Sequence, residues 1–122
     1  MAENTKLRGG ALLAKALKEK GVDHVFTLAG GFCNPALEGF MTNQMSVINC
    51  PHEQVAGHLA DGHARITRKP TVCLVGPEGF ANAVPAMLEA GMYAMVFDEQ
   101  NHHISLLAAA LPSRQPFSHF WS

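Results

Sequence analysis

An α/β fold built on a parallel sheet is predicted by the regular alternation of short apolar segments with amphipathic ones. Strand, turn and helix follow one another three times between residues 24 and 90. The strand segments are four or five residues long and rich in β-branched or aromatic side chains, whereas apolar residues between them recur at helical spacing. Connections between parallel strands place helices on both faces of a sheet, so we expect both faces to be covered.

The first half of the chain supplies two helices and one strand of this pattern. A helix is expected over Gly10–Lys20, because its apolar residues share one side and a glycine follows where a helix ends. The segment HVFTL (His24–Leu28) predicts a strand that ends at the turn formed by Gly30 and Gly31. A short helix over Pro35–Phe40 should follow, with proline in its first turn.

The second half repeats the pattern and then departs from it. Strands are predicted at Ser46–Asn49 and Thr71–Val75, with a helix opened by Pro51 between them and another helix beginning near Phe80. Beyond residue 97 the periodicity predicts one further helix, Ile104–Leu111, and then a tail containing proline and serine.

Composition excludes several classes of function. The 122 residues suffice for one compact domain, the formal net charge is −1, and the nine Lys and Arg residues are scattered, so we expect no nucleic-acid or membrane partner. Cys33, Cys50 and Cys73 stand far apart, without a disulfide framework. No apolar run approaches the roughly 20 residues that span a bilayer. A reducing, cytoplasmic location is therefore expected.

The loops that leave the carboxyl ends of parallel strands form the binding edge of such a sheet. Gly30-Gly31, Glu53 and the turn GPEG (Gly76 to Gly79) all fall on that edge. Neither turn matches a dinucleotide or phosphate-loop motif, and glycine is routine in such turns. Glu53 lies in a first helical turn, where a carboxylate also simply favours the positive end of the helix dipole. From spacing alone, both the structural and the functional interpretation stay open.

The seven histidines do not predict a metal site. His58 and His63 share a helix with His52 nearby, but separations of six and five residues do not place two of them on one face. We therefore expect no metal ligands within this chain. A hydrolase is not expected either, because no GxSxG elbow is present and the cysteines lack the local context of a nucleophile.

Three segments together resemble a known family. HVFTLAGG (24–31), INCPHEQVAGHLADGHARITRKP (48–70) and VCLVGPEGFANAV (72–84) are similar to the pyrimidine-binding domain of thiamine-diphosphate-dependent enzymes, in the group of acetolactate synthase, benzaldehyde lyase and 2-hydroxyacyl-CoA lyase. The middle segment, HE followed by AGHxADGxAR and Lys-Pro, is the most specific. The resemblance covers the chain from about Leu7 to Ala90.

The resemblance implies a role for each residue that matches the motif. The counterpart of Glu53 hydrogen-bonds the aminopyrimidine of thiamine diphosphate and promotes the tautomer that removes the thiazolium C2 proton. Gly30 and Gly31 would let the backbone approach the cofactor or substrate, and Gly79 with Asn82 would line the neighbouring loop. The cofactor's diphosphate and Mg²⁺ would be held by a domain that this chain does not contain, since the family's GDG…N motif is absent.

The departures from the family divide the chain and leave two functional hypotheses. GPEG replaces an SGPG-like turn, and GMYAMVFDEQNHHIS replaces the usual continuation, so we assign 1–98 to a partial pyrimidine-binding domain and 99–122 to a divergent tail. The first hypothesis is the N-terminal part of a carboligase, decarboxylase or lyase acting on 2-keto acids or 2-hydroxyacyl compounds, partnered by a chain carrying the diphosphate-binding domain or by self-association. The alternative is a truncated or degenerate, non-catalytic module that retains the fold and a pairing surface.

Overall fold

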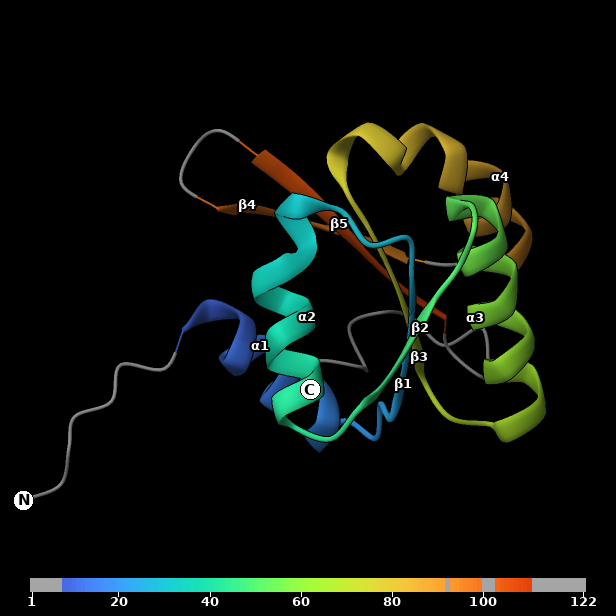
Figure 1. The fold of residues 1–122 in the computed structure, drawn as a ribbon. Coiled ribbons are helices and arrows are strands. Elements are labelled where there is room, and N and C mark those ends of the chain that lie inside the picture. The colour runs from blue at the N-terminus through green and yellow to red at the C-terminus, as the bar shows by residue number, and fades with distance from the viewer. Residues whose placement is uncertain (1–7, 92, 100–102, 111–122) are drawn as a thin grey trace, which may run out of the picture.

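The elements of the fold follow the predicted alternation closely (Figure 1). The computed structural model describes residues 8–91, 93–99 and 103–110, with side chains for 8–91. The helices are α1 (Gly9–Glu19), α2 (Asn34–Thr42), α3 (Glu53–Thr67) and α4 (Phe80–Ala90), with short 3-10 turns η1 (Gly31–Cys33) and η2 (Pro77–Gly79). The strands are β1 (His24–Thr27), β2 (Ser46–Asn49), β3 (Thr71–Val75), β4 (Tyr93–Glu99) and β5 (His103–Ala110).

The five strands form one sheet in the order β2-β1-β3-β5-β4. Strand β1 pairs in parallel with both β2 and β3, which confirms the predicted parallel sheet for these strands. Strand β5 instead runs antiparallel to β3 and to β4, so a hairpin completes the sheet on the far side of β3. Among the described residues, no helix is long and apolar enough to cross a membrane.

The predicted helix over Ile104–Leu111 is wrong where the structure describes that segment. Residues His103–Ala110 form β5, with Ala110 opposite Thr71 and Leu106 opposite Val75. The run has no charged face that would define a surface helix, and it satisfies the backbone groups that the edge of β3 would otherwise leave unpaired. Tertiary pairing therefore overrides local preference. Strand β5 lies beyond residue 98, where we assigned a divergent tail; the domain boundary itself stays a prediction.

Helices cover both faces of the parallel strands, as predicted (Figure 1). Helices α1 and α2 lie on one face and pack against Val25, Val72 and Leu74. Helices α3 and α4 lie on the other face, over Phe26 and Cys73 among others. Neighbouring residues of one strand thus enter opposite cores, which is the two-residue period of a strand buried on both sides.

The course of the chain creates a switch point between β1 and β3. The chain leaves β1 towards α2 on one face, and it leaves the adjacent β3 towards α4 on the other. In open α/β sheets, the divergence of two such connections opens a crevice at the carboxyl ends of the strands. The fold therefore places η1 and η2 on either side of the expected binding edge.

Candidate functional site

Hydrogen bonds between neighbouring strands fix the carboxyl edge of the parallel sheet. The buried Thr27 hydroxyl donates to the carbonyl of Leu74 at 2.7 Å, which ties the end of β1 to β3. The amide of Cys50 donates to the carbonyl of Thr27 at 2.6 Å. The amide of Ala29 donates to Asn49 Oδ1 at 2.9 Å, so the loop after β1 is tied to the end of β2. These hydrogen bonds fix the carboxyl ends of β1, β2 and β3 relative to one another.

Glu53 is the first residue of α3, but its carboxylate is not the helix cap. The preceding residue, His52, has extended backbone angles, and its Nδ1 accepts the amide of Gln54 at 3.1 Å. This is the bond that an N-cap side chain supplies. A purely structural role for Glu53 is therefore limited to its favourable position at the positive end of the helix dipole.

The Glu53 carboxyl group lies across Gly79 and contacts Asn82. Asn82 Nδ2 donates to Glu53 Oε2 at 3.2 Å. A Cβ added at Gly79 would lie 2.2 Å from Glu53 Oε1 and 2.7 Å from its carboxyl carbon, so a side chain at this position would displace the carboxyl group. Glu53 is itself half-buried. The structure thus brings three of the predicted site residues together around one acid.

The two remaining predicted residues, Gly30 and Gly31, differ in their surroundings. A Cβ added at Gly30 would lie 3.4 Å from Glu78 Oε1, whereas a Cβ at Gly31 would meet nothing within 4 Å. Glu78 also reaches back over Gly76, where an added Cβ would lie 2.9 Å from its Oε1. The Glu78 carboxylate therefore lies between the loops that leave β1 and β3.

Glu78 is the site residue that the sequence analysis did not propose. Its side chain is exposed, and within the described part of the chain no hydrogen bond or ion pair holds its carboxylate. The available signal was a charged residue inside a glycine-containing turn directly after a fully buried strand. In the sequence this turn differs from the family pattern, and residue spacing does not show what its carboxylate contacts.

The cysteines near this edge are poor nucleophiles. Cys33, Cys50 and Cys73 are free and buried. Burial raises the pKa of all three thiols, and it raises the pKa of Cys73 to about 12, with the neighbouring Cys50 and Glu53 adding to the effect. A thiol held neutral in this way is inert as a nucleophile. The chemistry of this edge accordingly rests on its carboxyl groups.

Comparison with known proteins identifies the class to which this fold and edge belong. Residues 7–95 match the family model described as thiamine pyrophosphate enzyme, N-terminal TPP binding domain, and the chain belongs to this family. Thiamine pyrophosphate is another name for thiamine diphosphate. The match covers all four helices and the three parallel strands.

Individual relatives include synthases and a decarboxylase. The chain is 36% identical over 85 residues to the acetolactate synthase large subunit of Mycobacterium tuberculosis, which is 69% of this chain and 16% of that protein. It is 36% identical over 100 residues to the mitochondrial acetolactate synthase catalytic subunit of Saccharomyces cerevisiae, 77% of this chain and 14% of that protein. It is 34% identical over 111 residues to the probable 2-ketoarginine decarboxylase of Pseudomonas aeruginosa, 87% of this chain and 20% of that protein. The chain therefore spans one fifth or less of the curated relatives that it matches.

Proposed function

We propose that this chain supplies the cofactor-activating glutamate, Glu53, to a thiamine-diphosphate-dependent carboligase, decarboxylase or lyase acting on 2-keto acids or 2-hydroxyacyl compounds. The observation that carries the proposal is the placement of the Glu53 carboxyl group over Gly79, held by Asn82, at the carboxyl edge of the parallel sheet. The family match implies thiamine diphosphate as the cofactor. The names of the relatives, acetolactate synthase and 2-ketoarginine decarboxylase, support the proposed class of substrate.

The residues at this edge fit the aminopyrimidine of that cofactor. Asn82 binds one oxygen of Glu53, and the other oxygen lies over Gly79, which has no side chain to displace it. Gly30 and Gly31 line the opposite loop, with open space at Gly31. A flat ring with polar edge atoms requires this combination of a positioned acid and bare backbone.

Each residue then has a definite task. Glu53 holds a proton in a hydrogen bond to a ring nitrogen of the pyrimidine, as a general acid-base group must. Asn82 orients the carboxyl group through its amide donor. When bound, thiamine diphosphate would act as the electron sink for the carbanion formed at the substrate's carbonyl carbon. We propose that the diphosphate and Mg²⁺ are held by a diphosphate-binding domain, either on another chain or elsewhere in the same protein.

The test compares Glu53→Gln with the unmodified chain in the assembly that contains a diphosphate-binding domain. The amide keeps the shape and can still contact Asn82, but it cannot carry the ionisable proton. Exchange of the cofactor's C2 proton with deuterium, followed by NMR, should slow by about 10²- to 10⁴-fold. Size-exclusion chromatography checks that assembly is unchanged. Equal exchange rates in the two assemblies would overturn the catalytic assignment of Glu53.

The isolated chain should not bind the cofactor measurably. Most polar contacts to the diphosphate are proposed to come from the other domain, so calorimetry with thiamine diphosphate and Mg²⁺ should show no saturable heat. Micromolar binding by the chain alone would contradict the proposal that another domain binds the diphosphate.

Two observations favour the alternative, a non-catalytic module that retains a pairing surface. The Glu78 carboxylate places extra negative charge between the loops after β1 and β3. In addition, α3 and α4 expose large apolar side chains: Leu59 at 45%, Ile66 at 84% and Leu88 at 78%. Exposed apolar patches mark protein interfaces or aggregation sites. Light scattering of the chain should show self-association under either hypothesis, and the C2 exchange rate separates the two.

A further inference from the structure

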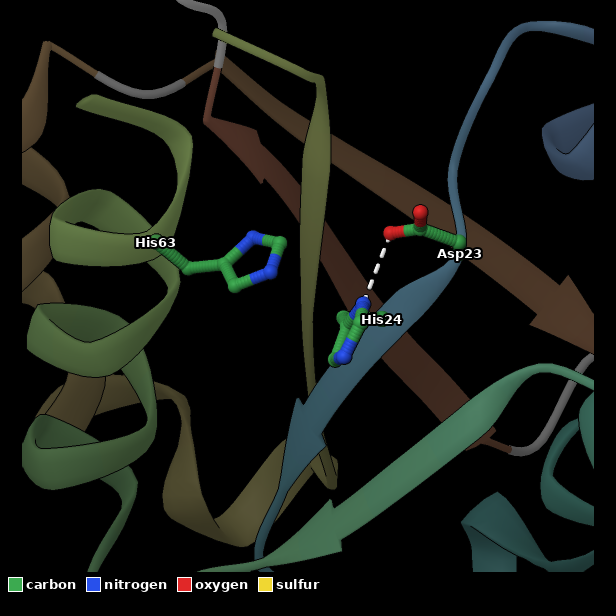
Figure 2. Close-up of side chains that lie close together, drawn as sticks. All are labelled: Asp23, His24 and His63. Atoms are coloured by element: carbon green, nitrogen blue, oxygen red, sulfur yellow. Dashed lines mark hydrogen bonds and ion pairs between the residues drawn. The ribbon is translucent and has the colours of Figure 1, made fainter. Parts of the chain in front are cut away.

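A second cluster of reactive side chains lies at the opposite, amino end of the parallel strands (Figure 2). Asp23 directly precedes β1, His24 is its first residue, and His63 projects from α3 towards them. One potential ligand atom from each of the three lies within 4.8 Å of the other two. The two imidazole rings have centroids 4.3 Å apart, and His24 Nδ1 donates to Asp23 Oδ1 at 2.7 Å.

We propose that Asp23, His24 and His63 form a binding site for a divalent transition-metal ion, with Zn²⁺ as the expected ion. Two imidazoles and one carboxylate form the mixed nitrogen and oxygen donor set that Zn²⁺ accepts. Ca²⁺ and Mg²⁺ favour donor sets made of oxygen alone, so this cluster does not suit them. Three protein ligands leave a fourth position for water.

Neighbouring polar groups already orient two of the three proposed ligands. His63 Nδ1 shares a 2.9 Å hydrogen bond with the hydroxyl of Thr71, a fully buried residue at the start of β3. This bond fixes the ring and leaves its other nitrogen for the metal, which is the usual support of a metal-binding histidine. Lys69 Nζ donates to Asp23 Oδ2 at 2.8 Å. Asp23 Oδ1 accepts from His24 Nδ1, and an ion would replace this hydrogen bond with loss of the Nδ1 proton. The Lys69 ammonium also opposes the approach of a cation, so we expect weaker binding than at a closed structural zinc site.

The site is independent of the proposed cofactor edge. Glu53 and Gly79 lie beyond the carboxyl ends of the strands, whereas this cluster lies at their amino ends. Strand β3 alone spans five residues of about 3.3 Å each between the two ends. Metal binding would therefore join the middle of α3 to the start of β1 without entering the cofactor site.

The spacing of histidines within one helix does not predict this cluster. His52 caps α3, while His58 and His63 lie within it; His58 is exposed, and His63 faces the sheet. The partners of His63 come from a loop and a strand that precede it by many residues. That proximity depends on the parallel pairing of β1 with β3 and on the packing of α3 against them.

Calorimetric titration of the full, tag-free chain with ZnCl₂ tests the proposal. The chain should bind one ion with a saturable isotherm. His24→Gln and His63→Gln should each weaken binding by at least about 10-fold, since losing a ligand costs no less than losing its support. Thr71→Val, which removes only the hydroxyl that orients His63, should weaken binding by about 10-fold. The matched control is His58→Gln, an exposed histidine of the same helix, which should leave the affinity unchanged.

Several outcomes would overturn the proposal. They are the absence of saturable binding, an equal loss in the His58→Gln control, or unchanged affinity in both His24→Gln and His63→Gln. Circular dichroism checks that each variant folds, and His24→Gln keeps the His63–Thr71 bond should His63→Gln fail to fold. Co²⁺ provides a second readout: visible absorption without a thiolate charge-transfer band supports nitrogen and oxygen ligands, whereas a strong near-ultraviolet thiolate band would assign the ion to cysteine and overturn the proposal.

Discussion

The polar side chains at the two ends of the parallel strands differ in how far they bind one another. At the amino end the groups bind one another: Asp23 accepts from both His24 and Lys69, and His63 is bonded to Thr71. Bonding to His24 and Lys69 lowers the pKa of Asp23 to about 2, and burial lowers the pKa of His63. At the carboxyl end, the Glu53 and Glu78 carboxylates lie beside glycines instead.

This difference shows where polar groups stabilise one another and where they have few protein partners. Mutual pairing lowers the cost of placing polar groups at the rim of a core. A carboxyl group with a single amide contact, as at Glu53, gains little stability from its position and remains open to a new partner. Functional sites commonly carry such stability costs. The following predictions test how far this contrast between the two ends extends.

The largest expected effect concerns thiols in the sheet and at its carboxyl end. The pKa of Cys73 is raised from 9.0 to about 12 by burial in the middle of β3, so its thiolate population at pH 8 is about 10³-fold lower than in the unfolded chain. Iodoacetamide should therefore modify Cys73 only after unfolding, whereas Cys33 and Cys50, which lie in the loops after β1 and β2, should react first as that end opens.

The same shift makes stability depend on alkaline pH. Because the folded pKa of Cys73 lies above the unfolded value, its contribution to stability is fully present below about pH 9. It is lost as the pH rises towards 12. Mass spectrometry of alkylated peptides checks the order of reaction, and modification of Cys73 before the other two would contradict the picture of a closed sheet with a more accessible carboxyl end.

The second prediction compares a glycine at the carboxyl end with one outside the proposed site. Gly79→Ala would place a Cβ against the Glu53 carboxyl group, a flexible side chain that can swing away, so we expect a small change in stability. In the complete assembly, however, the displaced acid should slow C2 proton exchange by about 10²-fold. Gly62→Ala, within α3 and outside the proposed site, is the matched control, because its Cβ would also meet nothing within 4 Å. Equal exchange rates in the two variants would show that Gly79 does not position the Glu53 carboxyl group for C2 proton exchange.

The parallel part of the fold was predictable because its signals are local. All three parallel strands and the four helices were predicted, with boundaries shifted by only a few residues. Each has a glycine or proline near an end and a clear period of apolar residues. Strand β5 was not predictable in this way. Its run of apolar residues suits a helix or a strand equally, and only the free edge of β3 decides between them.

The candidate site was predictable only in part, for a related reason. Resemblance to the family identified Glu53, Gly79 and Asn82, and the fold brings these three together. The resemblance assigned no role to Glu78 or to the cluster of Asp23, His24 and His63. Their positions depend on contacts between elements that are distant in the sequence, and residue spacing within one helix or one turn does not record such contacts.

The third prediction concerns the hydrogen bond that ties β1 to β3 near the carboxyl end. Thr27→Val keeps the shape of this buried residue but removes the donor to the Leu74 carbonyl. The free energy of unfolding should fall by about 1 kcal/mol, since a buried acceptor loses its partner. Thr42→Val is the control, because the Thr42 hydroxyl bonds the Glu38 carbonyl on an exposed helix surface and water can replace it. Urea unfolding measures the free energy of unfolding of both variants. Equal losses would show that the buried hydrogen bond between β1 and β3 stabilises the fold no more than the exposed one.

The smallest expected effect is at the amino end, where Lys69 pairs with Asp23. The pair links the loop before β3 to the loop before β1, but both side chains are substantially exposed, at 56% and 43%. Water and salt screen such a pair, so Lys69→Gln should cost no more than about 0.5 kcal/mol in metal-free buffer. The loss should disappear in 1 M NaCl, where screening already removes the attraction. Lys15→Gln, an exposed lysine on α1, should change nothing at either salt concentration. A loss of stability that persists at high salt would mean that Lys69 stabilises this end through the packing of its aliphatic stem. Charge pairing would then contribute less to the stability of the amino end than we infer.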